Sequence, residues 1–254
     1  MQQNKYDDPV FFTEYSKMPR SVYGLQAAGE WSAFKVHLPE LNNKTVLDLG
    51  CGYGWHCQYA AEQGASSVTG IDLSTKMLEK ARQLNTAKNV VYQHSSIETF
   101  IAKAASFDLI ISSLALHYVQ DLDAVFEKAA QLLVPQGELY YSVEHPIFTA
   151  RAQQDWIYSH EKQPLYWPVD HYFEEGQRQT QFLGTHVVKY HRTIETHVMA
   201  LLKAGFEITA LIEPLPSDEM IEKMGWQDER RRPMMLIIKA KKKRANHLAL
   251  FSKR

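Results

Sequence analysis

Short apolar runs alternate with stretches of helical periodicity through the middle of the chain. Five of these runs predict strands, at 45–48, 67–72, 90–93, 107–112 and 138–143. The intervening stretches predict helices over 55–63, 75–84 and 122–133, with a short helix or turn over 95–103. Because strands and helices alternate, the pattern predicts an α/β fold in which a doubly wound, mostly parallel sheet is covered by helices.

The segments on either side complete the predicted organisation. Strands at 206–212 and 233–240 bring the predicted sheet to seven. The predicted divisions are an N-terminal helical cap at 1–43, a core at 44–144, a substrate-side insertion or lid at 145–192, the C-terminal part of the same sheet at 193–240 and a basic tail at 241–254. The cap is either a packing helix pair or a flap over the ligand.

The insertion at 145–192 breaks the alternation. It holds nine aromatic residues and five histidines with little helical period. A long insertion at the ligand-binding edge of a sheet is commonly functional, which predicts a role at the substrate site. The alternative is a subdomain whose aromatic residues form a core of their own.

Charge and cysteine content narrow the function classes. The net charge of −1 gives no electrostatic reason to expect a nucleic-acid partner. The basic tail is interpreted as solvated, with contact to RNA or a membrane as the alternative. The two cysteines, Cys51 and Cys57, lack a second pair for a zinc site and are interpreted as core residues rather than reactive thiolates. Without a membrane-length apolar window we expect a cytoplasmic protein with no membrane contact, and a homodimer is possible.

A glycine turn follows the first predicted strand directly. Gly50, Gly52 and Gly54 stand at the start of the next predicted helix, where the lack of a Cβ lets a ligand approach the backbone. Asp72 ends the second predicted strand, at a distance that suits an acid binding the hydroxyl pair of a ribose. The sequence therefore predicts a nucleoside site.

Two residues bear on which nucleoside is bound. A dinucleotide fingerprint that begins at Gly50 requires a small residue where this chain has Trp55. Asp48, just before the glycines, would repel a pyrophosphate but suits an ammonium group. An NAD-dependent oxidoreductase is therefore the less favoured alternative.

Four segments resemble, in order and spacing, motifs of class I S-adenosylmethionine-dependent methyltransferases, and their form is similar to the methyltransferase type 11 group. These segments are 46–54, 70–74, 107–119 and 132–139. The resemblance implies a Rossmann-like methyltransferase fold, S-adenosylmethionine as methyl donor and a small-molecule methyl acceptor. A protein that binds S-adenosylmethionine without catalysis is a further alternative.

The resemblance also implies the residues that bind the donor. They are Asp48, Gly50, Cys51, Gly52, Asp72, Leu73, Ser96, Ile97, Ser112 and Ser113. Within this set, Asp48 would lie near the amino group, Asp72 would bind the ribose and Leu73 would pack on adenine. Ser96 stands where the family usually has an aspartate, and Glu98 could substitute for it. Arg20, with Tyr15, is a candidate for the methionine carboxylate because the charges are complementary.

Catalytic residues are expected after the fourth and fifth strands. His117, Glu144 and His145 are the candidates, each with a purely structural hydrogen-bonding role as the alternative. Methyl transfer from a sulfonium is an in-line displacement, so the protein mainly positions the acceptor and excludes water. A base is useful only if the acceptor is a hydroxyl or an ammonium. His186, His191 and Glu195 are too loosely spaced for a typical metal site, and we expect no metal.

Overall fold

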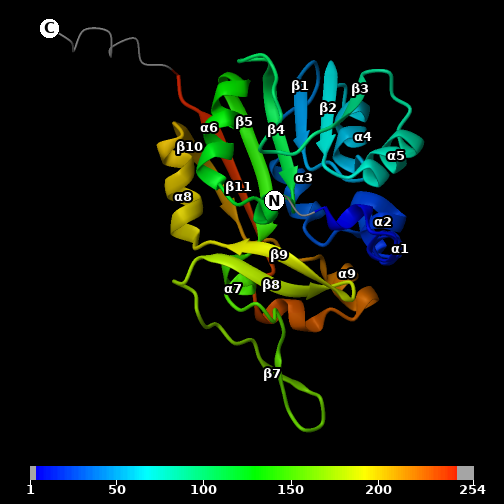
Figure 1. Ribbon diagram of the computed structural model, residues 1–254, viewed down its shortest axis with the longest axis vertical. Helices are drawn as coiled ribbons and strands as arrows, with labels where there is room; N and C mark the ends of the chain where they lie inside the picture. The colour runs from blue at the N-terminus through cyan, green and yellow to red at the C-terminus, as the bar shows by residue number, and fades with distance from the viewer. Residues whose placement is uncertain (1–3, 245–254) are drawn as a thin grey trace, which may run out of the picture.

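The computed structural model describes residues 4–244, and its centre is one twisted seven-stranded sheet (Figure 1). The strand order is β10-β11-β5-β4-β1-β2-β3, and only β11 runs antiparallel to its neighbours. The strands are β1 (Thr45–Leu49), β2 (Ser67–Asp72), β3 (Val90–His94), β4 (Phe107–Ser113), β5 (Leu133–Glu144), β10 (Phe206–Ile212) and β11 (Met235–Lys242). The predicted doubly wound, mostly parallel seven-stranded sheet is confirmed.

Helices cover both faces of the sheet because successive strand residues point to opposite sides. Leu47 of β1 packs into a core with residues of α6 (Leu122–Leu132) and α8 (Ile194–Lys203). Its neighbour Val46 packs into a second core with residues of α3 (Trp31–His37), α4 (Trp55–Glu62) and α5 (Thr75–Leu84). The N-terminal cap therefore forms part of the second helical layer.

Local sequence signals set several element boundaries. Ser74, the predicted cap of α5, accepts a hydrogen bond from the backbone N–H of Met77 at 3.1 Å. The stretch at 95–103 forms a turn rather than a helix. The predicted turn at 135–137 lies inside the bounds of β5, where the pairing with β4 shifts and Gln136 has a φ of +69°.

The insertion is built from one short helix and two hairpins. These are α7 (Pro146–Thr149), the hairpin of β6 (Ile157–Tyr158) with β7 (Pro164–Tyr166), and the hairpin of β8 (Gly176–Phe182) with β9 (Thr185–His191). The β8–β9 hairpin crosses the carboxyl end of the sheet, and the β6–β7 hairpin projects away from the body (Figure 1). The C-terminal part adds α9 (Asp218–Met224) and the 3-10 helix η4 (Gln227–Arg231) before β11.

The N-terminal region is a series of short helices. They are η1 (Lys5–Asp7), α1 (Pro9–Ser16), α2 (Pro19–Tyr23) and η2 (Gly24–Ala27), followed by α3. At the other end, β11 continues two residues into the predicted basic tail, and residues 245–254 of that tail lie outside the described residues. No helix between residues 4 and 244 is long and apolar enough to cross a bilayer.

Candidate active site

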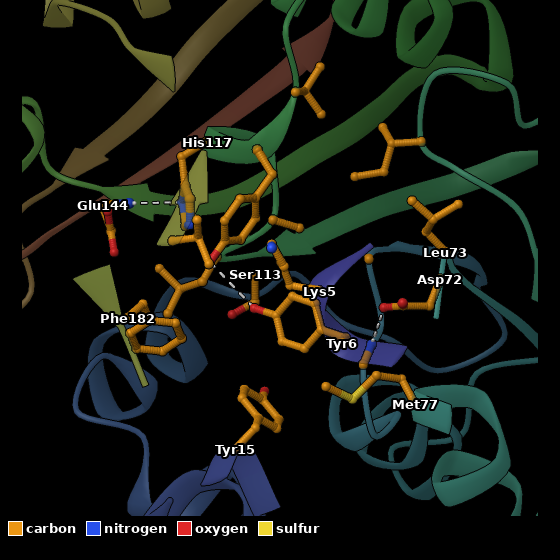
Figure 2. Close-up of a pocket in the computed structure, with 18 of the residues that line it drawn as sticks. Lys5, Tyr6, Tyr15, Asp72, Leu73, Met77, Ser113, His117, Glu144 and Phe182 are labelled. Carbon is orange, nitrogen blue, oxygen red and sulfur yellow. Dashed lines mark hydrogen bonds between the residues drawn. The ribbon is translucent and has the colours of Figure 1, made fainter. Parts of the chain in front are cut away.

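A cavity of about 1010 Å³ opens at the carboxyl ends of the parallel strands. Its walls come from the glycine turn after β1, the ends of β2, β4 and β5, the N-terminal helices and the β8–β9 hairpin (Figure 2). This volume is at the upper end of the range for small-molecule sites, so the cavity has room for two ligands side by side.

The glycine turn forms one end of this cavity. The backbone N–H groups of Gly50 and Cys51 both donate to the carbonyl of Ile71 at 2.9 Å, which fixes the turn against β2. Gly50 has a φ of +74°, and a Cβ there would lie 2.5 Å from the Cβ of Ala115. Gly52 has a φ of +54°, and a Cβ there would meet nothing within 4 Å. Bare backbone therefore faces the cavity at Gly52, as a ligand approaching the turn requires.

Asp72 connects β2 to this turn. Its two carboxylate oxygens accept hydrogen bonds from the backbone N–H groups of Gly52 and Ser74, each at 2.8 Å. Burial raises the pKa of Asp72 above its ordinary value, while these two donors oppose the shift. Leu73, Ser96 and Ile97, all predicted site residues, line the cavity beside it. This end offers a carboxylate flanked by apolar surface.

Three of the residues predicted to bind the donor do not line the cavity. Asp48 is buried beneath the turn, where its Oδ2 accepts a hydrogen bond from the Cys57 thiol at 3.3 Å. Burial raises the pKa of Asp48 to about 7. Cys51 and Ser112 are also buried, and the Ser112 hydroxyl donates to the carbonyl of Leu49 at 2.8 Å. Asp48 is thus directed toward α4, because strand alternation places it on that side.

Tyr15 and Arg20 reach the cavity from the N-terminal helices, as the prediction requires. The Arg20 guanidinium also forms an ion pair with Glu30, whose side chain is 3% exposed. Trp55, which does not fit the dinucleotide fingerprint, packs against Gly24 at the junction of α2 and η2. The glycine turn and the N-terminal helices are therefore assembled around the same cavity.

The segment at residues 4–7 was not among the predicted site residues. Asn4, Lys5 and Tyr6 line the cavity, yet none belongs to a motif. Asp7 accepts hydrogen bonds at the start of α5 from the Ser74 hydroxyl at 2.6 Å and from the Lys76 backbone N–H at 3.1 Å. An acidic side chain is favoured at a helix N-terminus, so this contact holds the segment against the cavity.

At the opposite end, His117 and Glu144 line the cavity but His145 does not. The His145 ring is fully buried, with its Nε2 2.9 Å from Oε1 of Glu213 and its Nδ1 accepting from the backbone N–H of Ile147. Glu144 is the last residue of β5 and His145 is the N-cap of α7, and only Glu144 lines the cavity. The structure therefore separates His145 from the other two candidate catalytic residues.

The environment of His117 determines the charge of its ring and which ring nitrogen carries the proton. Its Nδ1 accepts a hydrogen bond from the backbone N–H of Glu144 at 3.4 Å (Figure 2). Burial lowers the pKa of His117 to about 4, so the ring is neutral near pH 7. A neutral ring that accepts at Nδ1 carries its proton on Nε2, which makes His117 a hydrogen-bond donor.

Aromatic side chains from separate parts of the chain enclose the middle of the cavity (Figure 2). The ring of Tyr6 lies edge-on to Tyr15, with centroids 5.2 Å apart, and its hydroxyl lies 3.4 Å from that of Tyr118. Phe182 and Tyr190 contribute from the β8–β9 hairpin. Burial raises the pKa of Tyr118, so this phenol stays protonated. A substrate-side role was predicted for the insertion, but no motif marked its individual contacts.

The two histidines of the insertion that were considered as metal ligands, His186 and His191, have separate hydrogen-bond partners. His186 bonds the amide of Gln181, and His191 bonds the Thr149 hydroxyl at 2.8 Å and the carbonyl of Tyr172. Among the residues that the structure describes, no three His, Cys, Asp or Glu side chains are arranged to hold a metal.

Comparison with known proteins adds independent findings. The family model of a methyltransferase domain, type 11, matches residues 47–141. A crystal structure assigned as an S-adenosylmethionine-dependent methyltransferase from Listeria monocytogenes is similar with a TM-score of 0.83 and 49% identity, covering 87% of this chain and 99% of that one. Another from Mesorhizobium loti has a TM-score of 0.81 and 41% identity, covering 86% of this chain and 100% of that one. A ubiquinone biosynthesis O-methyltransferase from Idiomarina loihiensis is 38% identical over 109 residues, which span 42% of this chain and 44% of that protein.

Proposed function

Because this chain belongs to the type 11 group of class I S-adenosylmethionine-dependent methyltransferases, we propose that it methylates a small molecule by in-line displacement. One observation carries the proposal. A single cavity connects the glycine turn and Asp72 at one end to His117 and Glu144 at the other. A donor and an acceptor bound in this cavity would face each other without intervening protein, which is the arrangement that direct transfer needs.

The protein is a methyltransferase, and S-adenosylmethionine is its methyl donor. When bound, this donor supplies a methyl group that its sulfonium has already activated. Gly52 offers bare backbone for the approach of the ligand, and the Asp72 carboxylate has lone pairs left for the ribose hydroxyls. Arg20 complements a carboxylate at the methionine end. The residues present therefore fit the donor.

The acceptor would lie at the end formed by Glu144 and His117. Glu144 can accept a hydrogen bond from an acceptor O–H or N–H, and the Nε2–H of His117 can donate one. Tyr6, Tyr118 and Phe182 would exclude water from the reacting atoms. The similarity to a ubiquinone biosynthesis O-methyltransferase supports oxygen as the receiving atom.

Binding and product formation test the proposal. Equilibrium dialysis should show that the protein binds S-adenosylmethionine and not NAD. Incubation of metabolite pools with donor labelled in its methyl group should then transfer the label to a small molecule. A donor with a chiral methyl group should give a product of inverted configuration. Preferential NAD binding, or retention of configuration through a methylated enzyme, would contradict the proposal.

A further inference from the structure

A buried lysine lies behind the acceptor end of the cavity. Lys189 of β9 is 2% exposed, and its Nζ lies 2.5 Å from Oε1 of Glu144. The same ammonium donates to Oε1 of Gln154 at 3.0 Å and lies over the ring of Phe182, 5.3 Å from its centroid. A buried ammonium is costly unless it is paired, so Lys189 requires Glu144 as its counter-ion.

Gln154 completes the arrangement around the carboxylate. Its amide N–H donates to Oε2 of Glu144 at 2.8 Å, and its carbonyl accepts from the Thr180 hydroxyl at 2.9 Å as well as from Lys189. Gln154 adopts a φ of +49°, in the left-handed region that a residue with a side chain rarely occupies. The backbone thus accepts strain where the Gln154 amide bridges the carboxylate to the β8–β9 hairpin.

These contacts determine the charge that a ligand meets. Glu144 lines the cavity while Lys189 does not, so an acceptor would touch the carboxylate and not the ammonium. The two charges nevertheless cancel at short range, and the neighbouring His117 is neutral. Burial raises the pKa of Glu144, but the Lys189 ammonium and the hydrogen bonds from Lys189 and Gln154 outweigh burial, and the net shift is downward. The Glu144–Lys189 pair therefore presents an ionised hydrogen-bond acceptor to the cavity and carries no net charge of its own.

We propose that Lys189 determines acceptor specificity by neutralising Glu144, so that the site takes an uncharged ring compound that bears a hydroxyl group. The inference rests on the proposed function, because it places the acceptor beside Glu144. An uncharged hydroxyl can donate to the carboxylate without giving up the hydration of an ion. A cation would compete with Lys189 for the same counter-ion, and an anion would face the carboxylate. The rings of Tyr118 and Phe182 supply flat apolar walls.

Three probes of similar shape and different charge test this proposal. The full chain, saturated with S-adenosylhomocysteine, is titrated calorimetrically with benzyl alcohol, benzylammonium and benzoate at neutral pH. We expect benzyl alcohol to bind at least about tenfold more tightly than either ion. Tenfold in Kd is the effect of one charge on the probe that has no counter-ion in the site. Tighter binding of benzylammonium or benzoate to the wild-type protein would overturn the proposal.

Charge-changing variants make the test specific. Lys189→Met should shift the preference by about tenfold toward benzylammonium, because Glu144 loses its counter-ion. Glu144→Gln should shift it toward benzoate, because Lys189 is left uncompensated. The double variant should keep the preference for benzyl alcohol, and Lys189→Arg should behave like the wild type. Unchanged preferences in the single variants would overturn the proposal, and Glu144→Gln still decides if Lys189→Met does not fold.

A second ion pair provides the matched control. The Nζ of Lys239 in β11 lies 3.4 Å from Oε2 of Glu138 in β5, and neither residue lines the cavity. Lys239→Met should leave the order of the three probes unchanged. If S-adenosylhomocysteine does not bind to the wild-type protein, the proposed function itself fails. If it binds and the probes follow another order, only the assignment of Lys189 fails.

Discussion

The Asp72 carboxylate accepts a hydrogen bond of 2.8 Å from the backbone N–H of Gly52, which ties the end of β2 to the turn after β1. Its other oxygen accepts from the N–H of Ser74 at the start of α5. Asp72 therefore holds three pieces of backbone in register while its carboxylate faces the cavity. The shape of the proposed donor site depends on this side chain as well as on the glycines.

Replacement of Asp72 should weaken donor binding more than it weakens the fold. Asp72→Ala removes a charged hydrogen-bond acceptor, which typically contributes about 1.5–3 kcal/mol, so the Kd for S-adenosylmethionine should rise roughly 10- to 100-fold. Asp108→Ala is the matched control, because Asp108 bonds the backbone and hydroxyl of Thr45 at the opposite end of the sheet. Calorimetric titration should show an unchanged Kd for the folded control. Equal effects of the two changes would contradict a binding role for Asp72.

Gly52→Ala should block the donor without a clash in the free protein. A Cβ at Gly52 meets nothing within 4 Å, so the added methyl would project into the space where a ligand approaches. Gly205→Ala is the matched control, because Gly205 has a φ of +86° and a Cβ there would also meet nothing within 4 Å. Gly205 does not line the cavity. Each variant should lose about 1–2 kcal/mol of stability from the left-handed conformation. Only Gly52→Ala should lose donor binding by titration.

The ion pair of Arg20 with Glu30 allows a structural role to be separated from a binding role. Arg20→Met leaves a buried carboxylate without its partner and should cost roughly 3–5 kcal/mol of stability in urea unfolding. The double variant with Glu30→Gln should recover most of this loss. Donor affinity should stay low in the double variant if Arg20 also binds the methionine carboxylate. Full recovery of affinity would assign Arg20 a structural role alone.

Asp48 should make stability depend on pH. Burial raises its pKa from 3.8 to about 7 in the folded protein, so the folded state retains a proton that the unfolded state releases. The stabilisation is complete below the unfolded pKa and is lost as pH rises toward 7. Relative to Asp48→Asn, the free energy of unfolding should fall by up to about 1.4 kcal/mol per pH unit across this range and then level off. The free energy of unfolding is measured by urea unfolding at a series of pH values. The same dependence on pH for both proteins would contradict the raised pKa.

Local sequence was sufficient to predict the fold and the segments that build the glycine-turn end of the cavity. The strand, glycine turn and helix at 45–63 form one continuous stretch, and Asp72 follows at the end of the next strand. Glycines, caps and apolar periodicity act within a few residues, so their geometry could be predicted from neighbours alone. The motif gives the position of Asp48 in the chain, and only the structure shows the face of β1 to which its side chain points.

Only the tertiary structure showed which residues build the end of the cavity that holds Glu144. Glu144 and Lys189 are 45 positions apart, and Asp7 and Ser74 are 67 apart, with no motif connecting either pair. The separation of Glu144 from His145 depends on the turn from β5 into α7, after which His145 pairs with Glu213. Such contacts arise when hairpins and helices pack over the edge of the sheet, and their energies depend on burial, which a linear pattern does not specify. The sequence by itself determined which donor is bound, and the packing of the insertion decided the charge and shape of the cavity end at which we propose that the acceptor binds.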